Sequence, residues 1–368
     1  MDCVKIRNLE AIFLVCVGVV NHIILFLPNV VISSTGSGAV LNITFIVLVV
    51  LLLGYFISKI FQKFPGLDIL DISQFLGGKW LKWIAGIIYI VFFIFSTSLI
   101  VRTFSENLQI QYFANTPIFL IVLGFLIVAG IANFLGAKSV IRCNSIIIPI
   151  MMISLLVAFV SIIPEYVWQR IFPIAGYSWT TTFFTCSTNI FTLSGLSLLF
   201  FLPPFLEDEN SISKVTMGSI LLGGFLLILS IICLLFSLPF VTTTIELSPM
   251  FLIIRTAEWG NVFQRPEAIF VLIWCLSVLC YISVLTMIIH HIFRKISGVQ
   301  NKKIPILFIL IAIFIVALLP RSFANLYFAH YQIYRYFAIG FAVVFQLMIC
   351  LLAFFKQKSK SNLNVRKE

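Results

Sequence analysis

Residues 22–31 read HIILFLPNVV, and residues 196–205 read LSLLFFLPPF. Each apolar run contains a Phe-Leu-Pro triplet, at 26–28 in the first run and at 201–203 in the second. Proline inside a helix removes a backbone hydrogen bond and clashes with the carbonyl group one turn back. The sequence therefore predicts two interrupted helices of the same kind, 175 residues apart (201 minus 26).

The composition around these runs is that of a membrane protein. Of the 368 residues, 61% are hydrophobic and only 10% are charged, and the mean hydropathy is +1.14. A soluble protein of this length is normally about a quarter charged. Long apolar stretches, without the short alternating pattern of a barrel, predict an all-α integral membrane protein. We expect ten transmembrane helices, at residues 9–33, 39–61, 80–101, 117–136, 140–163, 183–206, 215–240, 267–293, 304–320 and 334–355.

The basic residues orient these ten helices. With a cytoplasmic N-terminus, the inner segments hold eighteen of the 24 Lys and Arg residues and the outer segments hold six. Cytoplasmic loops carry such an excess of positive charge, so both termini are predicted to be cytoplasmic. The net charge of +11 is explained in this way. We expect no nucleic-acid partner, because no loop is long enough to form a basic soluble domain.

The two interrupted helices divide the chain. With ten helices, the first triplet lies near the outer face and the second near the inner face, as expected for a leucine-transporter-like 5+5 inverted repeat. The prediction is a single membrane domain over 1–368. Its first five-helix repeat spans 1–163, its second spans 183–355, and a cytoplasmic basic tail follows at 356–368.

Two longer links carry helix signals of their own. In residues 62–82, Asp68 or Asp71 can cap a short helix that Gly77 and Gly78 would end, which predicts a cytoplasmic interfacial helix. In residues 241–266, the stretch PMFLIIRTAEW has an apolar and a charged face. It predicts a second interfacial helix, on the outer side. Pro266 and Glu267 suit the first turn of the helix that follows.

Upstream of each triplet, glycine and polar residues lie near the middle of the membrane. GVVNH at 18–22 and NIFTLSGLS at 189–197 are expected to be unwound, which would leave backbone groups facing a ligand between helices one, three, six and eight. Such a site suits an amino acid or another small polar molecule. The alternative is that these side chains form hydrogen bonds between helices. The candidate ligand-binding residues are Gly18, Asn21, His22, Ser96, Asn189, Thr192, Ser194, Gly195 and Ser197.

The other polar groups have simpler interpretations. Arg102 and Glu106 are expected to form an ion pair at the membrane interface. His290 and His291, with the basic residues after them, are expected to form a solvated face, and residues 207–209 a solvated acidic turn. The eight cysteines show no disulfide or metal-binding spacing. We expect no metal, no cofactor and no catalysis, because no known catalytic motif occurs.

Several stretches together resemble a known family. They are GVVNHIILFLP at 18–28, FLGGKWLKWIAGIIYIVFFIF at 75–95, FPIAGYSW at 172–179, FTLSGLSLLFFLPPF at 191–205 and QRPEAIFVLIW at 264–274. In order and spacing they resemble the B subunits of GerA-type spore germinant receptors. These are the endospore germination permeases of the amino acid–polyamine–organocation transporter superfamily.

The resemblance implies a function that the residues alone do not give. It implies a subunit that senses a small nutrient in the spore inner membrane or cell membrane, beside a germinant receptor A subunit and a lipoprotein C subunit. Family members often carry Glu where this chain has Ser197, which puts the ligand class in doubt. The alternatives are an ion-coupled amino acid permease, and an ion conduit or ligand-free assembly subunit of the receptor complex.

Overall fold

The computed structural model describes residues 5–25, 27–246, 248–256, 266–299 and 303–365, and these residues are almost entirely helical. The α-helices are α1 (Asn8–Leu25), α2 (Leu27–Thr35), α3 (Ala39–Phe61), α4 (Ile69–Gln111), α5 (Ile118–Phe134), α6 (Ala137–Ser161), α7 (Trp179–Phe183), α8 (Ile212–Ser237), α9 (Phe240–Ile245), α10 (Pro249–Thr256), α11 (Pro266–Ser297), α12 (Lys303–Leu318), α13 (Phe323–Phe328), α14 (Arg335–Ala338) and α15 (Phe345–Val365). The 3₁₀-helices are η1 (Gly36–Gly38), η2 (Ile163–Glu165), η3 (Trp168–Ile171), η4 (Thr185–Phe201), η5 (Pro203–Phe205) and η6 (Glu209–Ser211). The π-helices are η7 (Ala329–Tyr334) and η8 (Ile339–Val344).

The helices agree with the predicted membrane spans. Within the described residues, 8 helical segments are long and apolar enough to cross a membrane, and they coincide with eight of the ten predicted spans. The other two predicted spans, 117–136 and 304–320, correspond to the shorter apolar helices α5 and α12, of 17 and 16 residues. The all-α membrane class is confirmed, and the count of ten spans stays a prediction.

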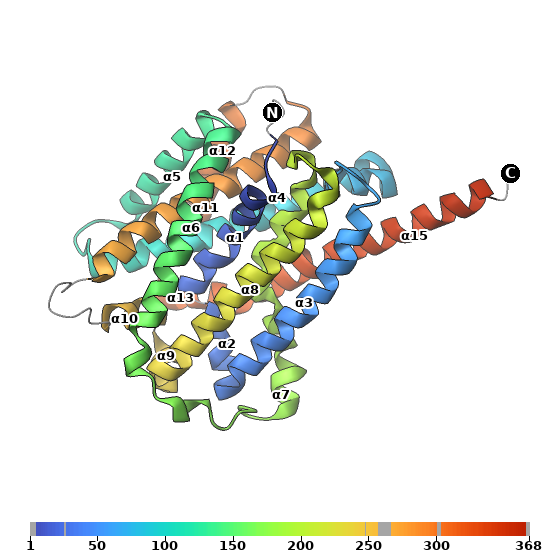
Figure 1. Cartoon of the computed structure of the whole chain (residues 1–368). Helices are drawn as coiled ribbons and strands as arrows, with labels where there is room; N and C mark the ends of the chain where they lie inside the picture. The colour runs from blue at the N-terminus through green and yellow to red at the C-terminus, as the bar shows by residue number, and fades with distance from the viewer. Residues whose placement is uncertain (1–4, 26, 247, 257–265, 300–302, 366–368) are drawn as a thin grey trace.

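Helix α1 forms the centre of the bundle. It packs against α6, α8, α11 and η4, and the longer helices lie around it (Figure 1). Its side chains from Leu14 to Leu25 are all buried. A helix that is apolar around its whole circumference is expected at such a position, because no face of it meets solvent.

The second triplet interrupts a helix, as predicted. The first interruption stays a prediction, because Phe26 lies outside the described residues; helix α1 is described up to Leu25 and α2 from Leu27. Helix η4 ends at Phe201, and η5 begins at Pro203. The predicted unwinding of residues 18–22 and 189–197 is wrong.

Those two stretches are helical throughout. Residues 18–22 are α-helical, and residues 189–197 belong to the 17-residue 3₁₀-helix η4. Backbone groups in both stretches are therefore within regular helices, so a ligand there would meet side chains. A 3₁₀ run of this length is unusual, because its hydrogen bonds are less well aligned than those of an α-helix.

The two triplets lie at opposite ends of the bundle. Ile6, just before α1, forms a parallel bridge with Leu206, just after the second triplet. Its N–H donates to the Phe205 carbonyl at 2.8 Å, and the Glu207 N–H donates to the Ile6 carbonyl at 3.1 Å. The interruption at the second triplet therefore lies beside the start of α1, whereas the first triplet follows the far end of α1.

The first predicted interfacial helix is present and is capped as expected. Asp68 accepts hydrogen bonds from the Leu70 and Asp71 N–H groups, and Asp71 accepts one from the Asp68 N–H, which is a capping box. The backbone angles mark the end of this helix, because Gly77 and Gly78 are non-helical and Gly78 has a φ of 67°. Any residue other than glycine would be strained at that φ.

The second predicted interfacial helix corresponds to α10. Met250, Phe251, Ile253 and Ile254 are buried on one face, and Arg255 is exposed on the other. The last part of the predicted stretch, residues 257–259, lies outside the described residues. Helix α11 begins at Pro266, as predicted.

Arg102 and Glu106 form the predicted ion pair, with 2.8 Å between Nη2 and Oε1, and both residues are buried in the protein. One prediction about surface charge is wrong. His291 is not part of a solvated basic face, because its Nε2 lies 3.1 Å from Asp68 Oδ2. Lys295 donates to the same Asp68 oxygen at 2.7 Å. These contacts fasten the inner end of α11 to the start of α4.

Residues 207–209 agree with their simpler interpretation. Glu207, Asp208 and Glu209 are all exposed, and the Asp208 carboxylate accepts a hydrogen bond from the Asn210 N–H at 3.0 Å. They form a solvated turn between η5 and α8. The cysteines described by the structure are free thiols, and most of them are buried.

Candidate functional site

The candidate site is built where α1 crosses η4. Gly18 and Gly195 meet backbone to backbone at this crossing. A Cβ atom built on Gly195 would lie 2.4 Å from the Gly18 carbonyl oxygen, and one built on Gly18 would lie 2.9 Å from the Gly195 oxygen. Only glycine at both positions permits this approach, which brings the side chains around the crossing together.

Five side chains form a polar cluster beside this crossing. We call His22, Ser96, Ser194, Tyr281 and Tyr334 the central cluster. The Ser96 hydroxyl lies 2.8 Å from the Tyr281 hydroxyl and 3.3 Å from that of Tyr334. The Ser194 hydroxyl lies 2.9 Å from the Tyr334 hydroxyl, and His22 Nε2 lies 3.2 Å from the Tyr281 hydroxyl.

The aromatic rings of the central cluster fix its geometry. The His22 ring stacks on the Tyr334 ring with a centroid distance of 5.5 Å and an interplanar angle of 16°. It meets the Tyr281 ring edge to face at 5.6 Å. All five side chains are buried, and they come from α1, α4, η4, α11 and η7. The cluster therefore joins five helices in one hydrogen-bonded network.

A small cavity adjoins the central cluster. Its volume of about 10 Å³ has room for about one water molecule. Five of the nine predicted site residues line it, together with Tyr281 and Tyr334 of the central cluster. The five are Gly18, Ser96, Ser194, Gly195 and Ser197.

The other four predicted residues do not line the cavity. Asn21 donates to the Ser277 carbonyl and accepts from the Ser277 hydroxyl, so it joins α1 to α11. Asn189 donates to Ser34 and Asn42, so it joins η4 to α2 and α3. These are the interhelical contacts that the sequence left as the alternative.

Thr192 has a local partner. Its hydroxyl donates to the Asn189 carbonyl three residues earlier, at 2.8 Å. This is the spacing of a 3₁₀ turn, so the side chain supports the winding of η4. His22 is the last predicted residue, and it contacts the cavity through the tyrosines of the central cluster.

Tyr281 and Tyr334 were not predicted from the sequence. Each stands in an apolar span where an aromatic residue is ordinary, and neither belongs to a motif. A signal was nevertheless present, because a buried tyrosine hydroxyl needs a hydrogen-bond partner. The small polar residues of the other spans were the partners to consider.

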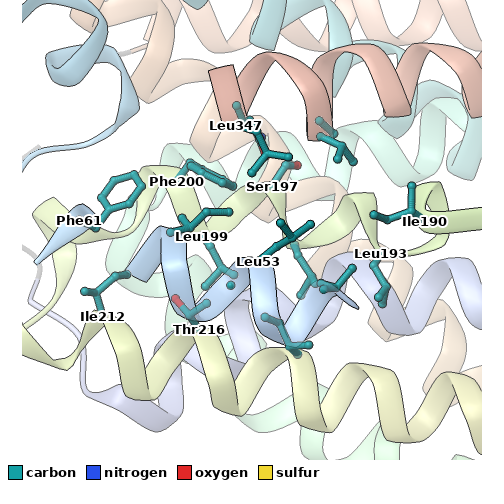
Figure 2. A pocket seen from close by; sticks show the side chains of 18 residues that line it. Leu53, Phe61, Ile190, Leu193, Ser197, Leu199, Phe200, Ile212, Thr216 and Leu347 are labelled. Carbon is teal, nitrogen blue, oxygen red and sulfur yellow. The ribbon is translucent and has the colours of Figure 1, made fainter. Parts of the chain in front are cut away.

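A larger and mostly apolar pocket lies on the other side of η4. Its volume is about 80 Å³, and it is enclosed by α3, η4, α8 and the last membrane helix (Figure 2). Ser197 belongs to the walls of both the central cavity and this pocket. Among the described residues its hydroxyl has no hydrogen-bond partner. The apolar walls suit hydrocarbon, so a small polar molecule fits the central cluster better.

The family model for "Spore germination protein" matches residues 5–325. The chain belongs to this spore germination family. The resemblance seen in the sequence is therefore confirmed, including its permease-like character.

One relative in this family is the spore germination protein YndE of Bacillus subtilis (strain 168). It is 24% identical over 236 residues, which cover 61% of this chain. The matched part spans 62% of the length of that relative, which is less than two thirds of it.

Solved transporters share the fold of this family member. A Na⁺-coupled sialic acid symporter in a substrate-bound, outward-open state superposes with a TM-score of 0.68 at 12% identity, covering 94% of this chain and 79% of the symporter. A manganese transporter of Eremococcus coleocola superposes with a TM-score of 0.56 at 12% identity, over 94% of this chain and 78% of that chain. The family member is thus a multi-pass membrane protein with a leucine-transporter-like fold.

Proposed function

We propose that this chain is the membrane subunit of a nutrient germinant receptor, and that it binds a small polar ligand at the central cluster. The observation that carries the proposal is the meeting of five helices in one buried hydroxyl and imidazole network, beside the Gly18–Gly195 crossing. Ionisable and polar groups within membrane-spanning helices are rare, and they commonly mark a ligand pathway. Family membership supplies the link to spore germination.

Ligand binding requires a change in this structure. The central cavity holds about 10 Å³, which is too small for a nutrient molecule. α1 and η4 would separate at the glycine crossing, and the hydroxyl groups of the cluster would exchange their mutual hydrogen bonds for bonds to the ligand. A ligand that prefers the opened arrangement shifts the equilibrium toward it, by no more than its difference in affinity.

The remaining parts of the proposal come from the family. The subunit would lie in the spore inner membrane or cell membrane with both termini in the cytoplasm. An A subunit and a lipoprotein C subunit would be its partners, and the binding event would be relayed to them. The candidate ligand-binding residues remain Gly18, Asn21, His22, Ser96, Asn189, Thr192, Ser194, Gly195 and Ser197. In the opened arrangement, Asn21, Asn189 and Thr192 would give up the contacts that they make here.

A matched pair of serines tests this proposal. Ser96→Ala removes the hydroxyl that joins Tyr281 to Tyr334, and Ser98→Ala removes one that donates only to the Ile313 carbonyl. We expect spores carrying Ser96→Ala to need roughly tenfold more nutrient for half-maximal germination, the effect of losing one hydrogen bond. Spores carrying Ser98→Ala should respond as the unaltered strain does. Equal responses of the two variants, at equal receptor levels, would remove the site.

An ion-coupled permease is the second candidate. The observation that favours it is the superposition on a Na⁺-coupled symporter. It predicts saturable uptake of radiolabelled amino acids into vesicles that contain this chain without partner subunits. Uptake that requires an imposed sodium or proton gradient would support the permease over the receptor subunit.

A further inference from the structure

Arg335 is a charged residue of the last membrane helix, near the outer end of the span predicted at 334–355. It begins α14, between the π-helices η7 and η8, and the helical segment Asn325–Lys356 around it is apolar enough to span a membrane. The side chain is half-buried. Charged side chains at such positions are normally paired with an opposite charge or lie on the path of a ligand or ion.

The contacts of the Arg335 guanidinium group with the described residues are neutral. Its Nη2 donates to the Thr188 hydroxyl and, at 3.4 Å, to Asn189 Oδ1. Its central carbon lies 5.9 Å from the ring centroids of both Phe191 and Tyr331. The side chain therefore points into the protein, against η4, rather than toward lipid headgroups.

No carboxylate balances this charge in the part of the chain that the structure describes. None of the ion pairs among the described residues includes Arg335, whereas Arg102 pairs with Glu106 at 2.8 Å. The Nε atom of Arg335 is buried, and among those same residues it has no hydrogen-bond partner. A buried donor on an uncompensated cation is costly, and an anion that enters would relieve it.

Arg335 also lies directly next to the central cluster. Its neighbour Tyr334 bonds to Ser194 and Ser96 and lines the central cavity. The ring of Phe191, which contacts Arg335, lies 6.2 Å from the Tyr334 ring. One ligand could therefore reach both the guanidinium group and the hydroxyl groups of the cluster.

We propose that Arg335 binds the carboxylate group of the ligand. The guanidinium fork matches a carboxylate with two parallel hydrogen bonds, and the rings of Phe191 and Tyr331 would hold it in place. The Thr188 hydroxyl, which now accepts from Arg335, would be displaced as the carboxylate arrives. This site deepens the proposed function and depends on it, because it narrows the nutrient to a molecule with a carboxylate group. Uncharged sugars and nucleosides would be excluded.

The test uses acetate and acetamide, which differ in charge but hardly in shape. Full-length protein in phosphatidylcholine nanodiscs is titrated with each probe, and binding is followed by saturation-transfer NMR. We expect saturable binding of sodium acetate, at least about tenfold tighter than that of acetamide, because a charge-assisted pair is involved. Arg335→Gln should abolish the difference. Arg321→Gln, at an exposed arginine on the same predicted side, should keep it.

Arg335→Gln could fail to fold, so a second measurement uses the unaltered protein. Phenylglyoxal modifies arginine side chains, and peptide mass spectrometry reports the modified positions. Acetate should slow the labelling of Arg335 at least about threefold more than acetamide does, because only the anion pairs with the guanidinium group, and should leave Arg321 unaffected. Equal binding of acetate and acetamide, or equal protection by chloride and acetate, would overturn the assignment of a carboxylate site.

Failure of this site and failure of the proposed function are distinguishable. If acetate does not bind but Ser96→Ala spores lose their nutrient response, only the carboxylate assignment falls. If acetate binds at Arg335 but Ser96→Ala spores germinate normally, the anion site remains and the receptor proposal falls.

Discussion

Gly18 and Gly195 show how two residues without side chains control the candidate site. Their backbones touch, so α1 and η4 approach more closely than larger residues would allow. Beside this contact, the hydroxyl groups of Ser96 and Ser194 share the Tyr334 hydroxyl across the helix interface. Polar residues gathered in the membrane interior are held by mutual hydrogen bonds, because lipid offers none.

Gly195→Ala tests this contact. The added methyl group would lie 2.4 Å from the Gly18 oxygen, so one helix must move. We expect a loss of about 1–3 kcal/mol in the free energy of unfolding, as for other overpacked interiors. Thermal unfolding of the detergent-purified protein measures it.

Gly124→Ala is the matched control for that substitution. Gly124 is a helical glycine in α5, and a methyl group added there would have no neighbour within 4 Å, so alanine should be neutral or slightly stabilising. If both variants unfold at the same temperature as the parent protein, the crossing is looser than its geometry indicates.

At the scale of the helices, kinks and π-helical segments determine how the bundle packs. Gly77 and Gly78 separate the short interfacial helix from the membrane part of α4. The last membrane helix contains two π segments, and η7 carries both His330 and Tyr334. π-helical segments often occur at functional sites, and this one brings Tyr334 into the central cluster.

The cap of α4 predicts a dependence of stability on pH. Burial raises the pKa of the Asp68 carboxyl, but hydrogen bonding to His291 and the positive charge of Lys295 outweigh burial and lower the pKa to about 2. The unfolded chain has the ordinary value of 3.8. As the pH falls from about 4 to 2, Asp68 is therefore protonated in the unfolded state before it is protonated in the folded state. The free energy of unfolding decreases over this range.

We expect this loss to amount to about 2 kcal/mol, measured as the free energy of unfolding between pH 4 and pH 2. Asp68→Asn should flatten that part of the curve. Asp208→Asn, at an exposed cap of η6, should leave the curve parallel to that of the parent protein. Parallel curves for all three proteins would show that the Asp68 contacts do not form in solution.

Across the whole bundle, both ends are fastened by contacts distant in sequence. At one end, Ile6 bridges to Leu206, and Lys295 joins Asp68. At the other end, Asn42 and Asn189 join α3 to η4. Figure 1 shows the start of α1 at the upper end of the bundle, and α2, α7 and α9 at the lower end. The excess of basic residues predicts that the end where α1 begins is cytoplasmic.

Single cysteines in a cysteine-free variant test this orientation. Tyr177→Cys lies between η3 and α7, and Lys63→Cys lies between α3 and α4; both positions are exposed. We expect a membrane-impermeant maleimide to label Tyr177→Cys in intact cells, and Lys63→Cys only after permeabilisation. The cysteine-free parent gives the background. The reverse pattern of labelling would invert the topology.

Local signals along the chain were enough to predict the class of this protein and the position of the interruption at its second triplet. Long apolar runs must cross a membrane as helices, and proline cannot continue a helix interior, so neither feature depends on distant contacts. The cap at Asp68 and the kink at Gly77 and Gly78 were predictable for the same reason. The family followed from the order of several stretches along the chain.

Which polar residues meet depended instead on how the helices pack. The fold placed Tyr281 and Tyr334 against Ser96, and it paired Asn21 with Ser277. Residues 18–22 are helical, and Gly18 among them packs closely on a partner glycine 177 positions away (195 minus 18). Contacts between distant segments depend on how helices cross, and neither periodicity nor composition records the crossing.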